Sequence, residues 1–250
     1  MCPCPAPRRI TTPAMVCLAA LWGAAPASAE VRADAAAYGA AAGLRAAADA
    51  EAAPAAVGRV FSGASLRPGQ ALCTGTLIAP DTVLTAAHCV RDAVDRPRSI
   101  RFEAGRDGDR IVAARAGRAV ILAPADVGAA RLAADVALLR LDGPIPAAAA
   151  APLPVAGVTG SAFRRYGYTR RAPDAALAAD CGLAAMDRGV IGLDCAAESG
   201  HSGAPLLQRG GAGWVVVGVF VAASRIAGVD VSYAAEVPRA WRESPAVAPP

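Results

Sequence analysis

Three side chains that could together cleave a peptide bond lie far apart in the sequence. His88 lies in the motif Thr-Ala-Ala-His-Cys, Asp135 opens the run Asp-Val-Ala-Leu-Leu-Arg-Leu, and Ser202 lies in Gly-His-Ser-Gly-Ala-Pro. A serine hydroxyl is a weak nucleophile near neutral pH, so it needs an imidazole to accept its proton and a carboxylate to orient that imidazole. Each residue alone could be structural. Together the three motifs predict nucleophilic catalysis by Ser202, with His88 as general base and Asp135 as its orienting group.

The glycines around Ser202 indicate how a developing negative charge could be stabilised. Gly200 and Gly203 allow a tight turn, because glycine adopts backbone conformations that other residues avoid. Such a turn can direct the backbone N–H groups of Gly200 and Ser202 at one point. These two groups are the predicted oxyanion hole, which binds the oxygen that becomes charged when the acyl carbon turns tetrahedral.

These motifs resemble the chymotrypsin/trypsin-like serine peptidase family, and more closely its secreted bacterial branch. The resemblance covers roughly residues 57–243, and its specific parts are the segments 73–89, 135–141 and 200–206. The order His, Asp, Ser also separates the chain from subtilisins and α/β-hydrolases. The resemblance implies an all-β fold of two six-stranded antiparallel β-barrels with the active site between them. It also implies a serine endopeptidase that forms an acyl-enzyme.

The remaining sequence is compatible with this organisation. Short apolar runs separated by Gly, Pro and Asp predict many strands, as in a sandwich or barrel, and they include 82–86, 136–141, 152–155 and 182–187. We expect a short C-terminal helix at 237–242, and a loop or short helix in the alanine-rich residues 172–179. The expected domains are a signal peptide at 1–29, a leader or propeptide at 30–56, the first barrel at 57–146, the second barrel at 147–243 and a flexible tail at 244–250.

Export is indicated by the first residues of the chain. Two arginines, an apolar core at 14–25 and Ala-Ser-Ala at 27–29 form a secretory signal with a cleavage site. A membrane anchor is the alternative, but this core is too short to cross ~30 Å of hydrocarbon. We therefore expect a secreted or periplasmic protein that has no membrane contact once the signal is removed.

The charge balance does not suggest a nucleic-acid partner. All 25 basic residues are arginine, and against 21 acidic residues they leave a net charge of +4. A basic patch dense enough for nucleic acid is not evident in this pattern. We expect a monomer that acts on proteins or peptides and needs no cofactor.

Cysteine usage agrees with an oxidising compartment. Three of the seven cysteines fall in the signal, and the remaining four are Cys73, Cys89, Cys181 and Cys195. An even number in an exported chain predicts two disulfides, for which the sequence alone allows three pairings. The family resemblance selects Cys73–Cys89, and Cys181–Cys195 then follows. Zinc is the alternative, but we expect no metal because the mature chain has no Cys-x-x-Cys and only two histidines.

The resemblance also indicates which residues form the primary specificity pocket. Ala196 and Ala197 would lie at its base, and Val221 and Ala223 would line another wall. Cleavage after Lys or Arg needs a carboxylate at the base, so we expect no preference for these residues and favour a small-to-medium apolar side chain. Relatives usually have a serine at the position of Val221, where it helps to hold the catalytic aspartate.

His201 is the main departure from the family pattern. The mammalian enzymes have an aspartate there, which pairs with a new N-terminal amine after zymogen cleavage, and a histidine cannot supply that permanent charge. His201 could simply satisfy buried backbone groups, or its protonation near pH 6–7 could loosen the oxyanion loop. These departures keep open an alternative function, a catalytically weak or inactive protease-like binding or regulatory protein.

Overall fold

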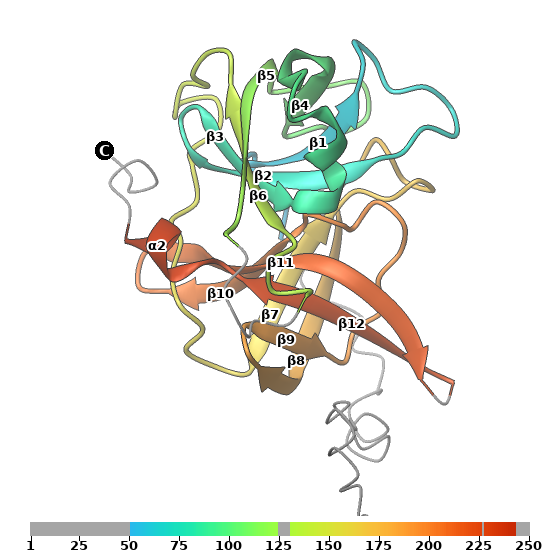
Figure 1. Cartoon of the computed structure of the whole chain (residues 1–250), viewed down its shortest axis with the longest axis vertical. Helices are drawn as coiled ribbons and strands as arrows, with labels where there is room; N and C mark the ends of the chain where they lie inside the picture. Colours follow the sequence, from blue (N-terminus) through green and yellow to red (C-terminus); the bar gives the residue numbers. More distant parts are fainter. Residues whose placement is uncertain (1–50, 125–130, 227, 244–250) are drawn as a thin grey trace, which may run out of the picture. The chain divides into compact units, whose positions relative to one another are not determined.

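Twelve strands close into two antiparallel barrels in the computed structural model, which describes residues 51–124, 131–226 and 228–243 (Figure 1). The expected two six-stranded barrels are therefore confirmed. The expected signal peptide, the leader as far as residue 50 and the tail at 244–250 lie outside the described residues.

The first barrel has the strand order β1-β2-β3-β6-β5-β4, and β4 closes it by pairing with β1. Its strands are β1 (Val57–Ser62), β2 (Cys73–Ala79), β3 (Thr82–Ala86), β4 (Ile100–Ala104), β5 (Ala113–Leu122) and β6 (Val136–Leu141). Three short 3-10 helices follow β3, namely η1 (Ala87–Cys89), η2 (Arg91–Ala93) and η3 (Pro97–Ser99).

The apolar residues of strand β6 pack into two different hydrophobic clusters. Side chains alternate between the faces of a strand, so Leu139 points into the first barrel while Val136 and Leu138 point outward. The outward residues belong to a cluster that also contains Tyr166 and Val219 of the second barrel. The apolar contact between the barrels therefore holds the start of β6, and with it Asp135, at their junction.

The second barrel has the strand order β10-β11-β12-β9-β8-β7, and β7 closes it by pairing with β10. Its strands are β7 (Ala162–Gly167), β8 (Leu177–Asp187), β9 (Val190–Leu193), β10 (Pro205–Gly210), β11 (Gly213–Ile226) and β12 (Val229–Glu236). The expected C-terminal helix is present as α2 (Arg239–Arg242).

Two local expectations differ from the structure. Residues 177–179 were expected in a loop or helix, but they begin β8 and pair with β7, where Ala178 lies opposite Tyr166. Closure of the barrel supplies hydrogen bonds that outweigh the helix propensity of alanine. Residues 152–155 form a linker rather than a strand. Leu153 donates to Leu77 of the first barrel (2.9 Å) and Ala156 to Val216 of the second (2.9 Å).

No helix in the described ranges is long and apolar enough to cross a membrane.

Candidate active site

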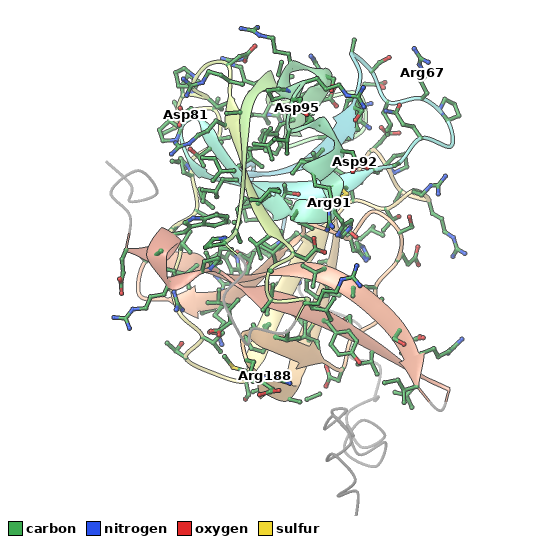
Figure 2. All side chains as sticks on the ribbon, in the orientation of Figure 1. Arg67, Asp81, Arg91, Asp92, Asp95 and Arg188 are labelled. Carbon is green, nitrogen blue, oxygen red and sulfur yellow. A yellow bond between two sulfur atoms is a disulfide. The ribbon has the colours of Figure 1, made fainter. Side chains whose placement is uncertain are left out.

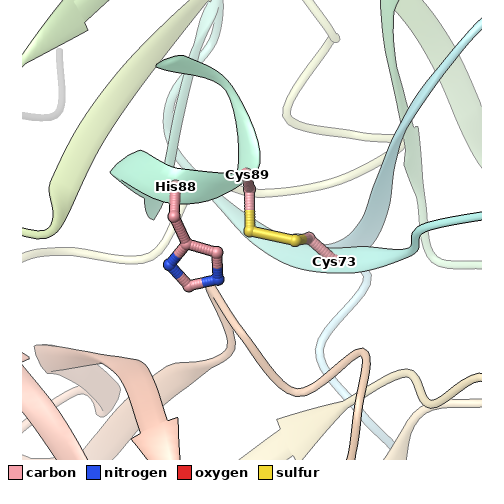
Figure 3. A group of neighbouring side chains, drawn as sticks. All are labelled: Cys73, His88 and Cys89. Carbon is pink, nitrogen blue, oxygen red and sulfur yellow. A yellow bond between two sulfur atoms is a disulfide. The ribbon is translucent and has the colours of Figure 1, made fainter. Parts of the chain in front are cut away.

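His88 lies on η1, directly after the buried strand β3. The Cys73–Cys89 disulfide joins the next residue to the start of β2, and Figure 3 shows the imidazole beside this bridge. The loop that carries His88 is therefore tied covalently to the strand next to it. The Cys181–Cys195 disulfide joins β8 to the segment before the serine loop. The structure thus contains both predicted disulfides.

Asp135 holds His88 through two hydrogen bonds. His88 Nδ1 lies 2.6 Å from Asp135 Oδ2, and the backbone N–H of His88 donates to Asp135 Oδ1 (2.8 Å). A carboxylate only accepts hydrogen bonds, so Nδ1 carries a proton, and in the neutral ring Nε2 keeps its lone pair. This tautomer can accept a proton from a serine hydroxyl.

Arg91 is a third partner of this pair, and no sequence motif marks it as one. Its Nη2 donates to Asp135 Oδ1 (2.9 Å), and Figure 2 labels Arg91. Burial alone would raise the pKa of Asp135, but the hydrogen bonds from His88 and the charges of His88 and Arg91 outweigh burial and lower that pKa. The carboxylate is thus kept ionised, although the serine expected at position 221 is absent.

Ser202 lies on a loop that is seated against the first barrel through Thr74. The backbone N–H of Thr74 donates to Ser202 O (2.8 Å), and its hydroxyl donates to Gly200 O (2.9 Å). Thr74 is also the neighbour of Cys73, whose disulfide reaches the His88 loop. One short segment of β2 therefore positions both the serine loop and the histidine loop.

The hydroxyl of Ser202 makes no hydrogen bond to any residue that the structure describes, including His88. Nucleophile–base hydrogen bonds are often long in enzymes without substrate and tighten only in the complex. Ser202 itself is half-buried.

Gly203 is required by this seating, because it adopts a positive φ of 83° and packs directly against the first barrel. A Cβ at this position would collide with the carbonyl of Thr74 and the hydroxyl of Thr85. Gly200 has a φ of 109°, and a Cβ there would lie 2.6 Å from the carbonyl of Tyr168. Both glycines of the motif are thus needed for conformation and for space.

The predicted oxyanion groups are available. Within the described ranges, neither the backbone N–H of Gly200 nor that of Ser202 donates to a protein acceptor, whereas the flanking N–H groups of His201 and Gly203 are both bonded. The loop therefore leaves unpaired the two donors that an oxyanion hole needs.

The predicted pocket residues lie on two segments that are both connected to Ser232 of β12. Ala196 is exposed and follows Cys195, whose carbonyl accepts a hydrogen bond from Ser232 Oγ on β12 (2.7 Å). Ser232 pairs in register with Ala223 of β11, which is also exposed. Ala197 is half-buried, and Val221 is buried. Ser232 of β12 therefore contacts the segment that contains Ala196 and also pairs with Ala223 of β11.

The buried guanidinium of Arg165 contacts the segment that contains Ala196. Arg165 on β7 is 4% exposed, donates from Nη1 to Ala196 O (2.7 Å) and stacks on Phe220 at 5.1 Å. Burial lowers the pKa of Arg165 to about 10, and the charge of Glu198 partly opposes this. The group remains protonated at physiological pH. Sequence reasoning missed it because position 165 lies 31 residues from its partner.

Arginines line a cavity next to the segment that precedes Gly200. A cavity of about 530 Å³ is lined by Arg170, Arg171, Glu198, Ser199, Arg225 and Asp230. Its two acids are already paired, Glu198 with Arg171 (3.9 Å) and Asp230 with Arg225 (3.2 Å). The side chains around this cavity therefore carry a net positive charge.

His201 is buried directly beside the nucleophile, at 4% exposure. Its Nδ1 accepts a hydrogen bond from the backbone N–H of Glu198 (2.9 Å), and its own N–H donates to Glu198 O (3.0 Å). Burial and the charge of Arg165 lower the pKa of His201 to about 3. Protonation near pH 6–7, one of the two interpretations from the sequence, is therefore disfavoured.

Cys73, His88 and Cys89 form the cluster of potential metal ligands found in the described part of the chain. Both sulfurs are in the disulfide, so the cluster has no thiolate to offer.

Two closed six-stranded barrels with a His–Asp pair at their junction define the chymotrypsin-like class of fold. The model of the trypsin-like peptidase domain family matches residues 73–219, and the chain belongs to this family, that of serine-type endopeptidases.

Solved structures support the fold. The chain is similar to a Glu endopeptidase at 20% identity and a TM-score of 0.58, covering 77% of this chain and 90% of the other. It is also similar to a thermostable serine protease from an extremophilic microorganism at 20% identity and a TM-score of 0.55, covering 73% and 93%. No curated protein matches the sequence.

Proposed function

We propose that this protein is an exported serine endopeptidase that cleaves peptide bonds through an acyl-enzyme on Ser202. The observation that carries the proposal is the His88–Asp135 pair, whose 2.6 Å contact fixes the imidazole tautomer needed in a general base. His88 Nε2 accepts the Ser202 proton as Oγ attacks the carbonyl carbon, and then gives that proton to the leaving amine. A water molecule then attacks the acyl-enzyme through the same two proton transfers, which releases the carboxylic acid and restores the Ser202 hydroxyl.

The oxyanion of each tetrahedral intermediate is bound by the N–H groups of Gly200 and Ser202. Support comes from their lack of protein acceptors in the described structure and from the glycine conformation that aims them. One such donor is worth about 10²–10³ in kcat in related chemistry.

The enzyme does not prefer Lys or Arg on the amino side of the cleaved bond. Ala196 and Ala197 offer no carboxylate, and the Arg165 guanidinium lies under the carbonyl of Ala196. Three further arginines line the adjacent cavity. A cationic substrate side chain would therefore meet like charge. A small-to-medium apolar side chain suits the exposed alanines of the pocket.

Export to the periplasm or the medium completes the proposal. It rests on the signal-like residues 1–29 and on two disulfides, which form in oxidising compartments. We place the domain limits at 57–146 and 147–243, with cleavage of the signal after residue 29.

Covalent labelling tests the activity. The secreted protein is treated with a fluorophosphonate probe, and Ser202→Ala serves as the control. We expect labelling of the wild type at Ser202 alone, located by peptide mapping. A folded wild type that resists the probe would instead favour the alternative, a binding or regulatory protein built on this fold.

A peptide library then tests the specificity, with substrates that differ only in Arg, Glu, Ala or Val before the cleaved bond. We expect the Arg peptide to be the poorest substrate and the Ala or Val peptide the best. Preferred cleavage after Arg would refute the charge argument, and preferred cleavage after Glu would refute the apolar assignment.

A further inference from the structure

His201 closes the oxyanion turn with two reciprocal hydrogen bonds to a single residue. Its ring Nδ1 accepts from the backbone N–H of Glu198 (2.9 Å), while its own N–H donates to the carbonyl of Glu198 (3.0 Å). The residues between them include Gly200, whose N–H is one of the proposed oxyanion donors. The imidazole therefore acts as a brace across the turn that presents these donors.

The brace requires a neutral ring. Because Nδ1 accepts a hydrogen bond, the single proton of the neutral ring is on Nε2, a buried atom with no partner among the described residues. A second proton would set Nδ1–H against the N–H of Glu198 and place a charge beside Arg165. Arg165 on β7 and Glu198 on the loop are the charged residues that act on this site, and Arg165 is the one that disfavours protonation.

The ring also fits its surroundings closely. Gly167 on β7 faces it, and a Cβ there would lie 2.8 Å from His201 Cδ2. A glycine at this position thus makes room for the imidazole on the face of β7 that also carries Arg165.

The segment that leads into the first barrel is held on the other face of β7. Tyr166 Oη donates to Glu51 O (3.0 Å), and the Glu51 carboxylate accepts from Trp214 Nε1 (3.1 Å) and pairs with Arg209 (2.5 Å). Side chains of neighbouring strand residues point to opposite faces, so Tyr166 directs Glu51 away from His201. An amine brought to His201 would be repelled by the charge of Arg165.

We propose that His201 is a positioning residue, a neutral brace that assembles the oxyanion loop without an N-terminal amine. The proposal rests on the proposed peptidase function. It predicts that the identity and charge of the N-terminus do not affect catalysis, so cleavage at the N-terminus is not a switch for this loop.

The absence of lysine gives a direct test. Because the sequence contains no lysine, the α-amine is the one primary amine of the secreted protein, and acetylation with an N-hydroxysuccinimide ester modifies that group selectively. We expect unchanged kcat and an unchanged fraction of Ser202 labelled by fluorophosphonate. Loss of more than about half of either on complete acetylation, at an unchanged Tm, would overturn the proposal.

Two substitutions test the brace itself. In His201→Asn the amide oxygen can replace Nδ1 as acceptor, and we expect kcat within about threefold of wild type. In His201→Leu the N–H of Glu198 loses its acceptor, and we expect kcat to fall about 100-fold with little change in KM, because a displaced oxyanion donor acts in the transition state. Val217→Ala, in the core of the same barrel, is the control for general destabilisation. An equal loss in this control at matched Tm, or full activity of His201→Leu, would refute the role.

The protonation state is read by nitrogen-15 NMR on Ser202→Ala protein, which does not depend on activity. The chain has two histidines, so a His88→Ala spectrum assigns both. We expect His201 to remain the neutral Nε2–H tautomer from pH 8 to pH 5. A doubly protonated ring or an Nδ1–H tautomer in this range would overturn the proposal, even if fluorophosphonate labelling failed and the peptidase assignment were lost.

Discussion

The burial of His201 should make the stability of the protein fall steeply in mild acid. The ordinary pKa of histidine is 6.5, and in the folded protein burial and then the charge of Arg165 lower it to about 3. In the unfolded chain the ring therefore binds a proton below about pH 6.5, whereas the folded protein excludes it until about pH 3. Stability from this group is complete above pH 6.5 and is lost as the pH falls.

The size of this loss of stability follows from the difference between the pKa values of His201 in the unfolded and folded states. Each pH unit below the unfolded pKa costs ~1.4 kcal/mol until the folded pKa is reached. The cost is a few tenths of a kcal/mol at pH 7 and ~2 kcal/mol at pH 5. Asparagine does not titrate, so the His201→Asn protein should not lose this stability in acid. Between pH 7 and pH 5, its free energy of unfolding should therefore rise by ~2 kcal/mol relative to that of the parent protein.

Urea unfolding at pH 7 and pH 5 measures this change. Both proteins carry Ser202→Ala, which prevents self-digestion, and a Val217→Ala variant controls for core substitutions that do not titrate. We expect the control to differ from its parent by the same free energy at both pH values. The reasoning fails if His201→Asn also keeps a constant difference from its parent, within ~0.5 kcal/mol.

Three other perturbations have expected outcomes. Asp135→Asn should lower kcat by about 10⁴ at unchanged Tm, because an amide facing Nδ1 favours the wrong tautomer of His88; a loss of less than tenfold would contradict the assigned role. Arg91→Gln should lower kcat only about twofold to fivefold, because its side chain is 48% exposed, and salt should reduce the difference; steady-state kinetics at low and high salt would reveal a larger or salt-independent effect. Replacing Cys181 and Cys195 by serine should lower stability by about 3 kcal/mol for a loop of this length; an unchanged midpoint in urea, with wild-type protein as control, would show that the bridge does not stabilise the fold.

Much of the fold and of the candidate site can be predicted from the sequence, because both are recorded in local patterns. The strand at 136–141 is apolar except for Arg140, and a strand buried on both faces has nearly continuous apolar residues. The motifs around His88 and Ser202 contain the glycine and cysteine positions that their loops require. Residues 172–179 could not be assigned locally, since alanine has no preference for a sheet and pairing with β7 decides its structure.

The chain alone thus predicted the candidate catalytic residues, and it determined the class of fold and the cysteines available for cross-linking. The tertiary structure decided which polar side chains are buried and therefore desolvated. Arg165 reaches Ala196 across 31 residues, and Arg91 reaches Asp135 across 44. His201 can serve as the proposed neutral brace because β7 and the serine loop bury it beside a cation. Desolvation depends on everything packed around a group rather than on its neighbours in the chain.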